Sequence, residues 1–377
     1  MSFRHVYAVS LKEIRHILRD KATFILVVFT PTFLLLLLAY AVTADISHVP
    51  ISVLDMDRSP TSRAFIEQLT LGEDLELISQ VNHIDAIEDQ LLKGSIKAAV
   101  ILSPSFERDL IAMRGAGVQI LVDGTEPQSG GFAVDKIALR ADEFISKLLV
   151  RQLATQGITI DRLIPIDVRT QTWYNPNLKA SVDIIPGLLS IVLALPGMSV
   201  ALTLAREHEH GTLEQIMASP IGKAELLLGK MIPYILSGLI NIPLTTAIAL
   251  YWFEVPFNGN FGLFALLSGV FFFANLSMGV LIGVFIHSQA AALALSLLLI
   301  LFPGFFLTGI FFPIAAMPPI VRMEAMALPG THYAIITRAS FVTGAGINVL
   351  WTYGLALLMM GIMFTGIAAY SFKKKLA

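Results

Sequence analysis

The sequence has no cysteine and little charge. Only 14% of its 377 residues are Asp, Glu, Lys or Arg, whereas a soluble domain carries about 25%. The absence of cysteine excludes disulfides, thiolate metal ligands and a cysteine nucleophile. The formal net charge of −2 does not suit a nucleic-acid-binding protein, which carries a clustered basic face. So little charge in a chain that is 55% hydrophobic indicates that much of the surface faces lipid.

Motifs that hydrolyse or transfer a chemical group are missing as well. Gly222-Lys223 and Gly229-Lys230 lack the upstream glycine of a phosphate-binding loop, so the chain is not predicted to hydrolyse ATP. There is no Gly-x-Ser-x-Gly elbow and no His-Glu-x-x-His, and His208-Glu209-His210 lacks the spacing of a zinc site. We therefore expect no enzyme activity, no metal and no cofactor on this chain.

Long apolar stretches dominate what is present. A bilayer core about 30 Å thick needs roughly 20 apolar residues of helix. Six stretches meet this length and predict spans at 24–43, 184–204, 231–253, 261–286, 289–311 and 348–370. Val42-Thr43-Ala44 resembles a cleavage site, but the first stretch is longer than the apolar core of a leader peptide, so we expect it to be retained. Pro303-Gly304 predicts a kink in the fifth span.

Residues 44–183 form an insert in which charges are frequent and apolar runs are short. Strand-like and helix-like segments alternate along it, and this order is typical of an α/β domain. We predict strands at 49–54, 75–80, 96–102, 118–122 and 166–174, and helices at 60–69, 84–92, 106–113 and 128–155. The predicted fold class is an α-helical polytopic membrane protein with an inserted extracytoplasmic α/β domain.

Basic residues predict which side of the membrane each loop occupies. They gather before the first span, between the second and third spans, and after the sixth, while 254–260 has none. Because cytoplasmic loops carry the excess of Lys and Arg, we predict a bacterial inner-membrane protein with both termini in the cytoplasm.

The tail, 1–23, has Val6, Val9, Ile14, Ile17 and Leu18 near one helical face and Lys12, Arg15 and Arg19 on the other. This pattern predicts a helix lying at the membrane surface, with its basic residues toward lipid phosphates.

The cytoplasmic stretch 205–222 is unusually acidic for an inner loop. Gly211-Thr212 predicts a helix break and a new start, and Pro220 predicts the end of a short amphipathic helix. Such a helix is well shaped to dock on a cytoplasmic partner. A solvated turn between two spans is an equally good interpretation of the residues alone.

Polar residues inside the predicted spans are few. Asn241 and Asn275 lie in the third and fourth spans, where an asparagine either bonds a neighbouring helix or contacts a substrate. The former is the more common role. The stretch 312–346 is too apolar for a free loop and holds four prolines, so we predict short re-entrant helices that cap the outer end of the bundle.

The order of several motifs along the chain resembles a known family. The motifs are Lys12-Glu13-Ile14 through Arg19-Asp20-Lys21, Asp55-Met56-Asp57-Arg58-Ser59, Asn175-Pro176-Asn177, Arg206-Glu207-His208-Glu209-His210-Gly211-Thr212-Leu213-Glu214-Gln215 with Pro220, and Leu328-Pro329-Gly330-Thr331-His332-Tyr333. Together they resemble permease subunits of ABC-2-type exporters that have a large extracytoplasmic domain after the first helix. The resemblance spans nearly the whole chain, and the most specific part is Arg-Glu-x-Glu-x-Gly-Thr-x-Glu.

The resemblance implies a role for each region. The tail would be a connecting helix, with Glu13, Arg15 and Arg19 as its functional residues. The stretch 205–222 would be a coupling helix that contacts a separate ATPase subunit, which binds ATP and Mg²⁺. Its contact residues would be Glu207, Glu209, Gly211, Thr212, Glu214, Gln215 and Pro220, with Glu207 and Glu214 pairing with groups on the ATPase.

The working unit implied by the family has two permease copies, identical or paralogous, and two ATPases. It would export drugs, lipids or other amphipathic compounds, and a membrane-fusion adaptor is a further conceivable partner. The alternative is an envelope sensor, receptor or assembly protein of the same architecture without transport activity.

Overall fold

The computed structural model describes residues 2–42, 48–112, 114–155, 173–175, 179–213 and 220–372. Its contacts divide the chain into two compact units. We call Met1–Ala44 with Gln171–Ala377 the membrane unit, and Asp45–Thr170 the inserted domain.

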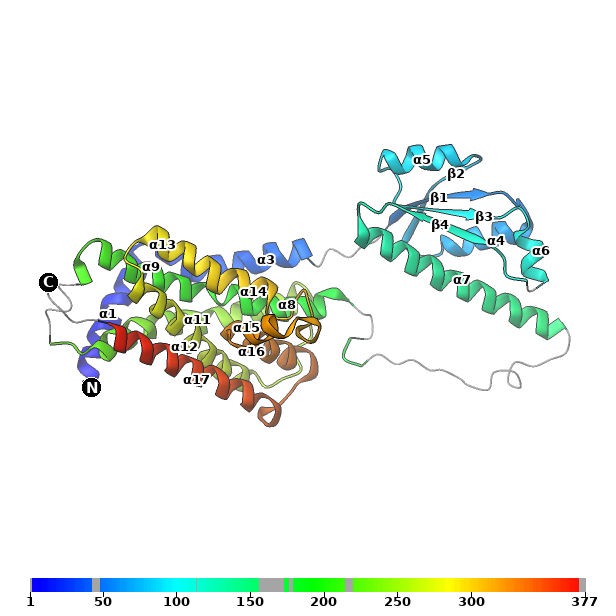
Figure 1. The fold of residues 1–377 in the computed structure, drawn as a ribbon. Helices are drawn as coiled ribbons and strands as arrows, with labels where there is room; N and C mark the ends of the chain where they lie inside the picture. Colours follow the sequence, from blue (N-terminus) through cyan, green and yellow to red (C-terminus); the bar gives the residue numbers. More distant parts are fainter. Residues whose placement is uncertain are drawn as a thin grey trace. The chain divides into compact units, whose positions relative to one another are not determined.

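The membrane unit is a bundle of apolar helices (Figure 1). Among the described residues, 5 helices are long and apolar enough to cross a membrane, and Val27–Val42 is a shorter apolar helix. The elements are α1 (Phe3–Arg19), α2 (Lys21–Phe24), η1 (Ile25–Phe29), α3 (Thr30–Val42), α8 (Ala180–Val192), α9 (Leu195–Glu209), α11 (Lys223–Tyr251), α12 (Phe261–Phe285), α13 (Gln289–Ser296), η3 (Leu297–Leu301), α14 (Phe302–Phe306), η4 (Ile314–Ala316), α15 (Pro319–Met326), α16 (Pro329–Arg338), η5 (Ala339–Thr343) and α17 (Ile347–Ser371). In Figure 1, α1 lies across one end of the bundle, and the ends of α3 and α8 that lead to the inserted domain lie at the other.

The second predicted span is broken rather than continuous. The helix stops at Val192 and restarts at Leu195, because Pro196 has no N–H to donate to the preceding turn. The Asn275 side chain donates to the Ala194 carbonyl at 2.7 Å and so satisfies a backbone group at the break. The span predicted at 184–204 contains this break, and α8 and α9 together form one candidate membrane span, Ala180–Glu209.

The fifth span distorts where its proline predicts. The π-helical turn η3 directly precedes α14, in which Pro303 is the second residue. A π-turn is one of the local adjustments that accommodate a missing backbone donor within a membrane helix. The following stretch, predicted as short capping helices, contains η4, α15, α16 and η5. Of these, α16 is largely buried, with Tyr333 stacked 4.0 Å from Phe271 of α12.

The inserted domain is built on a sheet with strand order β2-β1-β3-β4. Its strands are β1 (Val49–Asp55), β2 (Leu75–Val81), β3 (Ala98–Leu102) and β4 (Val118–Val122), and its helices are α4 (Pro60–Leu69), α5 (Ile84–Leu92), α6 (Phe106–Ile111) and α7 (Pro127–Thr155). The central strand β1 runs parallel to β2 and β3, and β4 is antiparallel to β3. The sheet and the long apolar helices confirm the predicted fold class.

Helices cover both faces of this sheet. The apolar side chains of α4, α6 and α7 pack on one face, and those of α5 pack on the other. Ser59 caps α4 by accepting the Ser62 N–H at 3.0 Å, and Pro60 occupies the first turn. Most of the strand predicted at 166–174 lies outside the described residues. Its last two residues, Trp173 and Tyr174, form a bend rather than a strand.

Candidate functional site

Helix α1 is held against α11 by close backbone approach. The Ser10 hydroxyl donates to the Gly229 carbonyl at 2.9 Å. A Cβ atom at Gly229 would lie 2.7 Å from Cβ of Val9, so only glycine permits this spacing. Ring nitrogen Nδ1 of His5 also lies 2.8 Å from the Glu225 carboxylate. The tail helix is therefore a fixed part of the membrane unit and not only a surface anchor.

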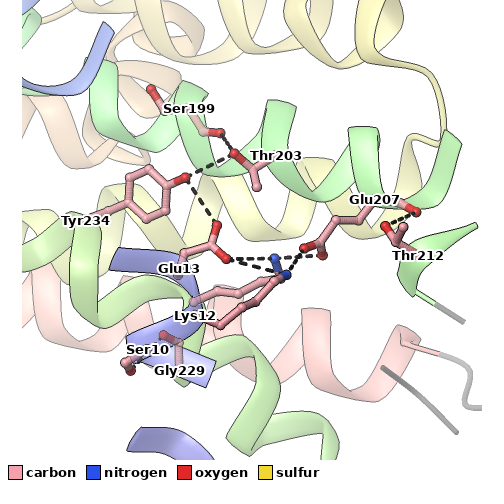
Figure 2. Close-up of polar contacts among 10 residues, drawn as sticks. Ser10, Lys12, Glu13, Ser199, Thr203, Glu207, Thr212, Gly229 and Tyr234 are labelled. Atoms are coloured by element: carbon pink, nitrogen blue, oxygen red, sulfur yellow. Dashed lines mark hydrogen bonds and ion pairs between the residues drawn. The ribbon is translucent and has the colours of Figure 1, made fainter. Parts of the chain in front are cut away.

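Four charged side chains meet where α1, α9 and α11 converge. Lys230 Nζ lies 2.7 Å from Glu207 Oε2 and 3.5 Å from Glu13 Oε2. Lys12 Nζ lies 2.6 Å from Glu207 Oε1 and 3.9 Å from Glu13 Oε2. We call these four residues the charge cluster, and Figure 2 shows how the carboxylates of α1 and α9 point toward the lysines.

Three of the four side chains in the charge cluster are largely shielded from water, whereas Lys12 is half exposed. The side chains of Glu13 and Lys230 are 1% and 2% exposed, that of Glu207 is 11% exposed, and that of Lys12 is 50% exposed. Two carboxylates and two ammonium groups balance in formal charge, as buried ions require. Because effective dielectric screening is weak at such a site, each charge strongly constrains the position of the others.

A hydrogen-bonded chain extends the charge cluster along α9. The Tyr234 hydroxyl donates to Glu13 Oε1 at 3.4 Å and lies 3.0 Å from the Thr203 hydroxyl. Thr203 in turn donates to the Ser199 carbonyl at 2.9 Å (Figure 2). Tyr234 of α11 thus contacts both Glu13 of α1 and Thr203 of α9, so polar contacts join the three helices beyond the charge cluster itself.

The described part of the stretch 205–222 has the predicted break at Gly211. Residues 205–209 are the last residues of α9, and the helix breaks at Gly211, whose φ is +68°. The Thr212 hydroxyl donates to the Glu207 carbonyl at 3.3 Å across this break. Glu214 and Gln215 lie outside the described residues, and Pro220 is exposed just before α11.

Glu207 has two charged partners within the chain itself. Its carboxylate is turned inward to Lys12 and Lys230, because a carboxylate near the end of a membrane helix is stabilised most by buried cations nearby. The pairing of Glu207 with a group on an ATPase stays a prediction. Lys12 is likewise turned to this carboxylate rather than to lipid phosphate.

The remaining predicted residues of α1 and α9 lie at the edge of the site. Arg15 and Arg19 are exposed on α1. Glu209 accepts hydrogen bonds from the backbone and side chain of Gln289 at 3.2 and 3.0 Å, which ties the end of α9 to the start of α13. Arg206 lies 3.3 Å from Asp20, a second link between α9 and the segment that follows α1.

The two membrane asparagines contact backbone. Asn241 donates to the Val27 carbonyl at 2.9 Å, inside the π-helical turn η1, as Asn275 donates at the break between α8 and α9. Both side chains are buried. Each therefore bonds between helices, the more common of the two roles weighed from the sequence.

Two central residues, Lys230 and Tyr234, were not predicted as site residues. Lys230 was counted only as one of the basic residues that orient the loop. Lys230 directly precedes the apolar part of α11, and a lysine in such a position requires a buried partner. The position of Lys230 in the sequence could therefore have identified it as a site residue. In the described part of the chain, no group of three or more His, Cys, Asp or Glu is arranged to hold a metal. The ion pairs that join α1, α9 and α11 suit mechanical linkage of these helices.

Comparison with known proteins gives a consistent result. Residues 21–370 match the family described as ABC-2 family transporter protein. The chain is similar to Probable multidrug ABC transporter permease YbhS of Escherichia coli (strain K12), with 28% identity over 379 residues that cover 100% of this chain and 98% of the relative. It is also similar to Inner membrane transport permease YhhJ of the same organism, with 27% identity over 383 residues that cover 98% and 97% of the two chains.

Proposed function

Because the chain belongs to the ABC-2 transporter family, we propose that its membrane unit forms half of an export pathway for drugs, lipids or other amphipathic compounds. As an ABC permease subunit of the inner membrane, it depends on a separate subunit for ATP hydrolysis. The relative YbhS is named as a multidrug permease, and this name supports the cargo class. ATP and Mg²⁺ would bind only to the partner ATPase, and a second permease copy would complete the pathway.

The charge cluster is the observation that carries the proposed mechanism. It joins α1, α9 and α11 through buried ions, so displacing one helix alone would separate charges in a weakly screened site. A push on the loop that follows α9 would therefore move the three helices together. Rigid-body movement of this kind is a common way to switch between two states.

In this mechanism the ATPase contacts the exposed part of the loop, and the charge cluster transmits the movement inward. Glu209, Gly211, Thr212, Glu214, Gln215 and Pro220 remain the proposed contact or hinge residues. Glu13 and Glu207 act as positioning residues behind them. Both chain termini would lie on the cytoplasmic side, which the basic residues of the tail support.

Glu214→Lys tests the proposed contact with the ATPase. In the complex reconstituted with its ATPase subunit, we expect drug-stimulated ATP hydrolysis to fall to the basal rate, because the substitution reverses a charge at the docking surface. Glu324→Lys makes the same change on an exposed residue of α15 and should leave stimulation intact. Normal stimulation in Glu214→Lys would remove the coupling assignment.

A further inference from the structure

The inserted domain contains an open apolar groove that the transport mechanism above does not use. Its volume is about 640 Å³, within the range of pockets that hold drug-sized ligands. It runs between α6 and α7 beside the start of β4. The lining residues are Thr61, Phe65, Phe106, Leu110, Ile111, Gly115, Ala116, Val118, Ala141, Phe144, Ile145, Leu148 and Leu149.

Aromatic side chains form a rigid inner wall of the groove. The ring of Phe65 lies 5.5 Å from that of Phe106 and 5.2 Å from that of Phe144, measured between centroids. All three rings are buried. At the opening, Ile111 and Ile145 are 60% and 40% exposed. Apolar surface that stays open to water next to a packed aromatic wall is typical of a binding site.

The charge around the groove is uneven. Among the described residues that line the groove, none is charged. At the Thr61 end, the threonine hydroxyl donates to the Glu107 carboxylate at 2.5 Å. The carboxylate of Asp57 accepts the Glu107 N–H at 3.1 Å, so two acidic residues lie near this end.

The arginines near this end are directed to other groups. Arg58 donates to Asn82 at 3.0 Å. A hydrogen bond from Ser105, followed by interactions with Arg108 and Arg114, lowers the pKa of Asp109. Arg108 Nε also lies 3.3 Å from Asp109 Oδ1, so this arginine is paired with Asp109. The polar end of the groove thus presents carboxylate to a ligand, beside an uncharged apolar trough.

We propose that this groove binds organic cations with an aromatic or acyl body, the body lying against Phe65 and Phe144 and the cationic group beside Glu107. Charge complementarity selects the cation, and the uncharged lining selects the apolar body. The inference rests on the proposed export of amphipathic compounds, because it makes the inserted domain a place where such a compound is held.

Binding of rhodamine 6G, an aromatic cation, tests the groove on the full chain in lipid nanodiscs, with empty nanodiscs as the background. Fluorescence polarisation should show saturable binding. Ile111→Arg should weaken it about tenfold, because it places a cation in the trough. Leu92→Arg is the matched control, since Leu92 is 87% exposed on α5, on the other face of the sheet. The affinity of this variant for rhodamine 6G should equal that of the wild type.

The cation preference has its own test. Glu107→Gln should weaken rhodamine 6G about threefold, as expected for a partly exposed ion pair, and leave the uncharged dye N-phenyl-1-naphthylamine unaffected. Equal binding of rhodamine 6G by the wild type and Ile111→Arg would overturn the groove assignment. An equal loss of both dyes in Glu107→Gln would overturn the cation assignment.

Access to the groove can be measured separately, because the natural chain has no cysteine. Ile111→Cys should react with a maleimide as fast as Leu92→Cys, and rhodamine 6G should protect only the former. Failure of Ile111→Cys to react without dye would mean that protein covers the groove, which would overturn the proposal. None of these assays needs the ATPase. If the dye binds but is not transported, the proposed export is refuted, while the assignment of the groove as a binding site still holds.

Discussion

The membrane unit and the inserted domain each hold a cluster of ion pairs, and the two clusters differ in their access to water. In the membrane unit, Glu13 and Lys230 are 1% and 2% exposed. In the inserted domain, Asp74 is 38% exposed where it lies 3.3 Å from Lys136 and 3.1 Å from Arg140. The same chemical groups are therefore screened by water in one place and scarcely screened in the other.

The difference teaches which ion pairs can constrain a movement. An exposed pair contributes little to stability, because water and salt replace each partner when it is lost. A buried pair cannot be separated so easily, since each ion left alone lacks solvation. The charge cluster therefore holds three helices in one arrangement, whereas the Asp74 pairs secure the surface of a domain that is already packed. Four substitutions test this contrast, beginning with the largest expected effect.

Lys230→Met should be the most damaging change. It leaves the buried carboxylates of Glu13 and Glu207 with Lys12 as the only remaining cation of the charge cluster, and breaking such a buried pair costs about 3–5 kcal/mol. Thermal unfolding of the purified chain in detergent measures the loss. Lys223→Met at the start of the same helix is the control and should unfold near the wild-type temperature. An unchanged midpoint for Lys230→Met would show that the buried and exposed clusters are equivalent.

The double variant Glu207→Gln with Lys230→Met should be more stable than Lys230→Met alone. Removing one carboxylate restores the balance of charge, and contacting residues show interaction energies of about 0.5–3 kcal/mol. A double-mutant cycle on unfolding midpoints gives this energy. Drug-stimulated ATP hydrolysis should stay low in the double variant, because the ionic link between α9 and α11 is absent. Full recovery of stimulation would mean that the charge cluster only stabilises the fold.

Lys12→Met should have a smaller effect than Lys230→Met. Its side chain is 50% exposed, so water partly solvates the Glu207 carboxylate when the lysine is lost, and we expect about 1 kcal/mol. High salt should reduce the difference between this variant and the wild type, but not that between Lys230→Met and the wild type. Unfolding midpoints measured at low and high salt provide the comparison. Equal salt sensitivity would contradict the difference in burial.

Asp74→Asn should have the smallest effect, about 0.5 kcal/mol, because Asp74 is 38% exposed and the buried Arg140 also donates to the Leu69 carbonyl. Burial alone would raise the pKa of Asp74, but hydrogen bonds and attraction from Lys136 and Arg140 outweigh it and lower the pKa below 3.8. Its contribution is therefore present above about pH 3.8 and is lost as the pH falls through the lowered pKa.

Hydrogen exchange in β2 and α7 is the measurement for Asp74→Asn. The variant should exchange slightly faster than the wild type near neutral pH and should match it at a pH below the lowered pKa. Asp135→Asn, a change at an exposed residue of α7, is the control. Its exchange rates should equal those of the wild type at both pH values. A difference that grows in acid would contradict the sign of the pKa shift.

Local patterns predicted the elements of both regions well. The strand segments beginning at Val49 and Val118 lie at the predicted residues, because short runs rich in β-branched residues favour strands. The long apolar spans follow from the thickness of a bilayer. The break at Gly211 follows from a left-handed backbone that glycine adopts readily. Each of these signals is contained within a few neighbouring residues.

The partners within the site could not be predicted in the same way. The family resemblance of the motif around Glu207 implied an external partner for this residue. Its cations, Lys12 and Lys230, come from two other helices. The interruption after Val192 was also missed, because its stability depends on Asn275 from another span.

The sequence by itself determined that this protein crosses a membrane, carries an α/β insert and lacks an ATP-hydrolysing motif, because composition, periodicity and short motifs are properties of adjacent residues. Only the tertiary structure decided that Lys12 meets Glu207 across 195 positions of the chain, and that Phe65, Phe106 and Phe144 wall a groove. Such contacts depend on how helices pack, and packing selects among many pairings that local sequence leaves equally open.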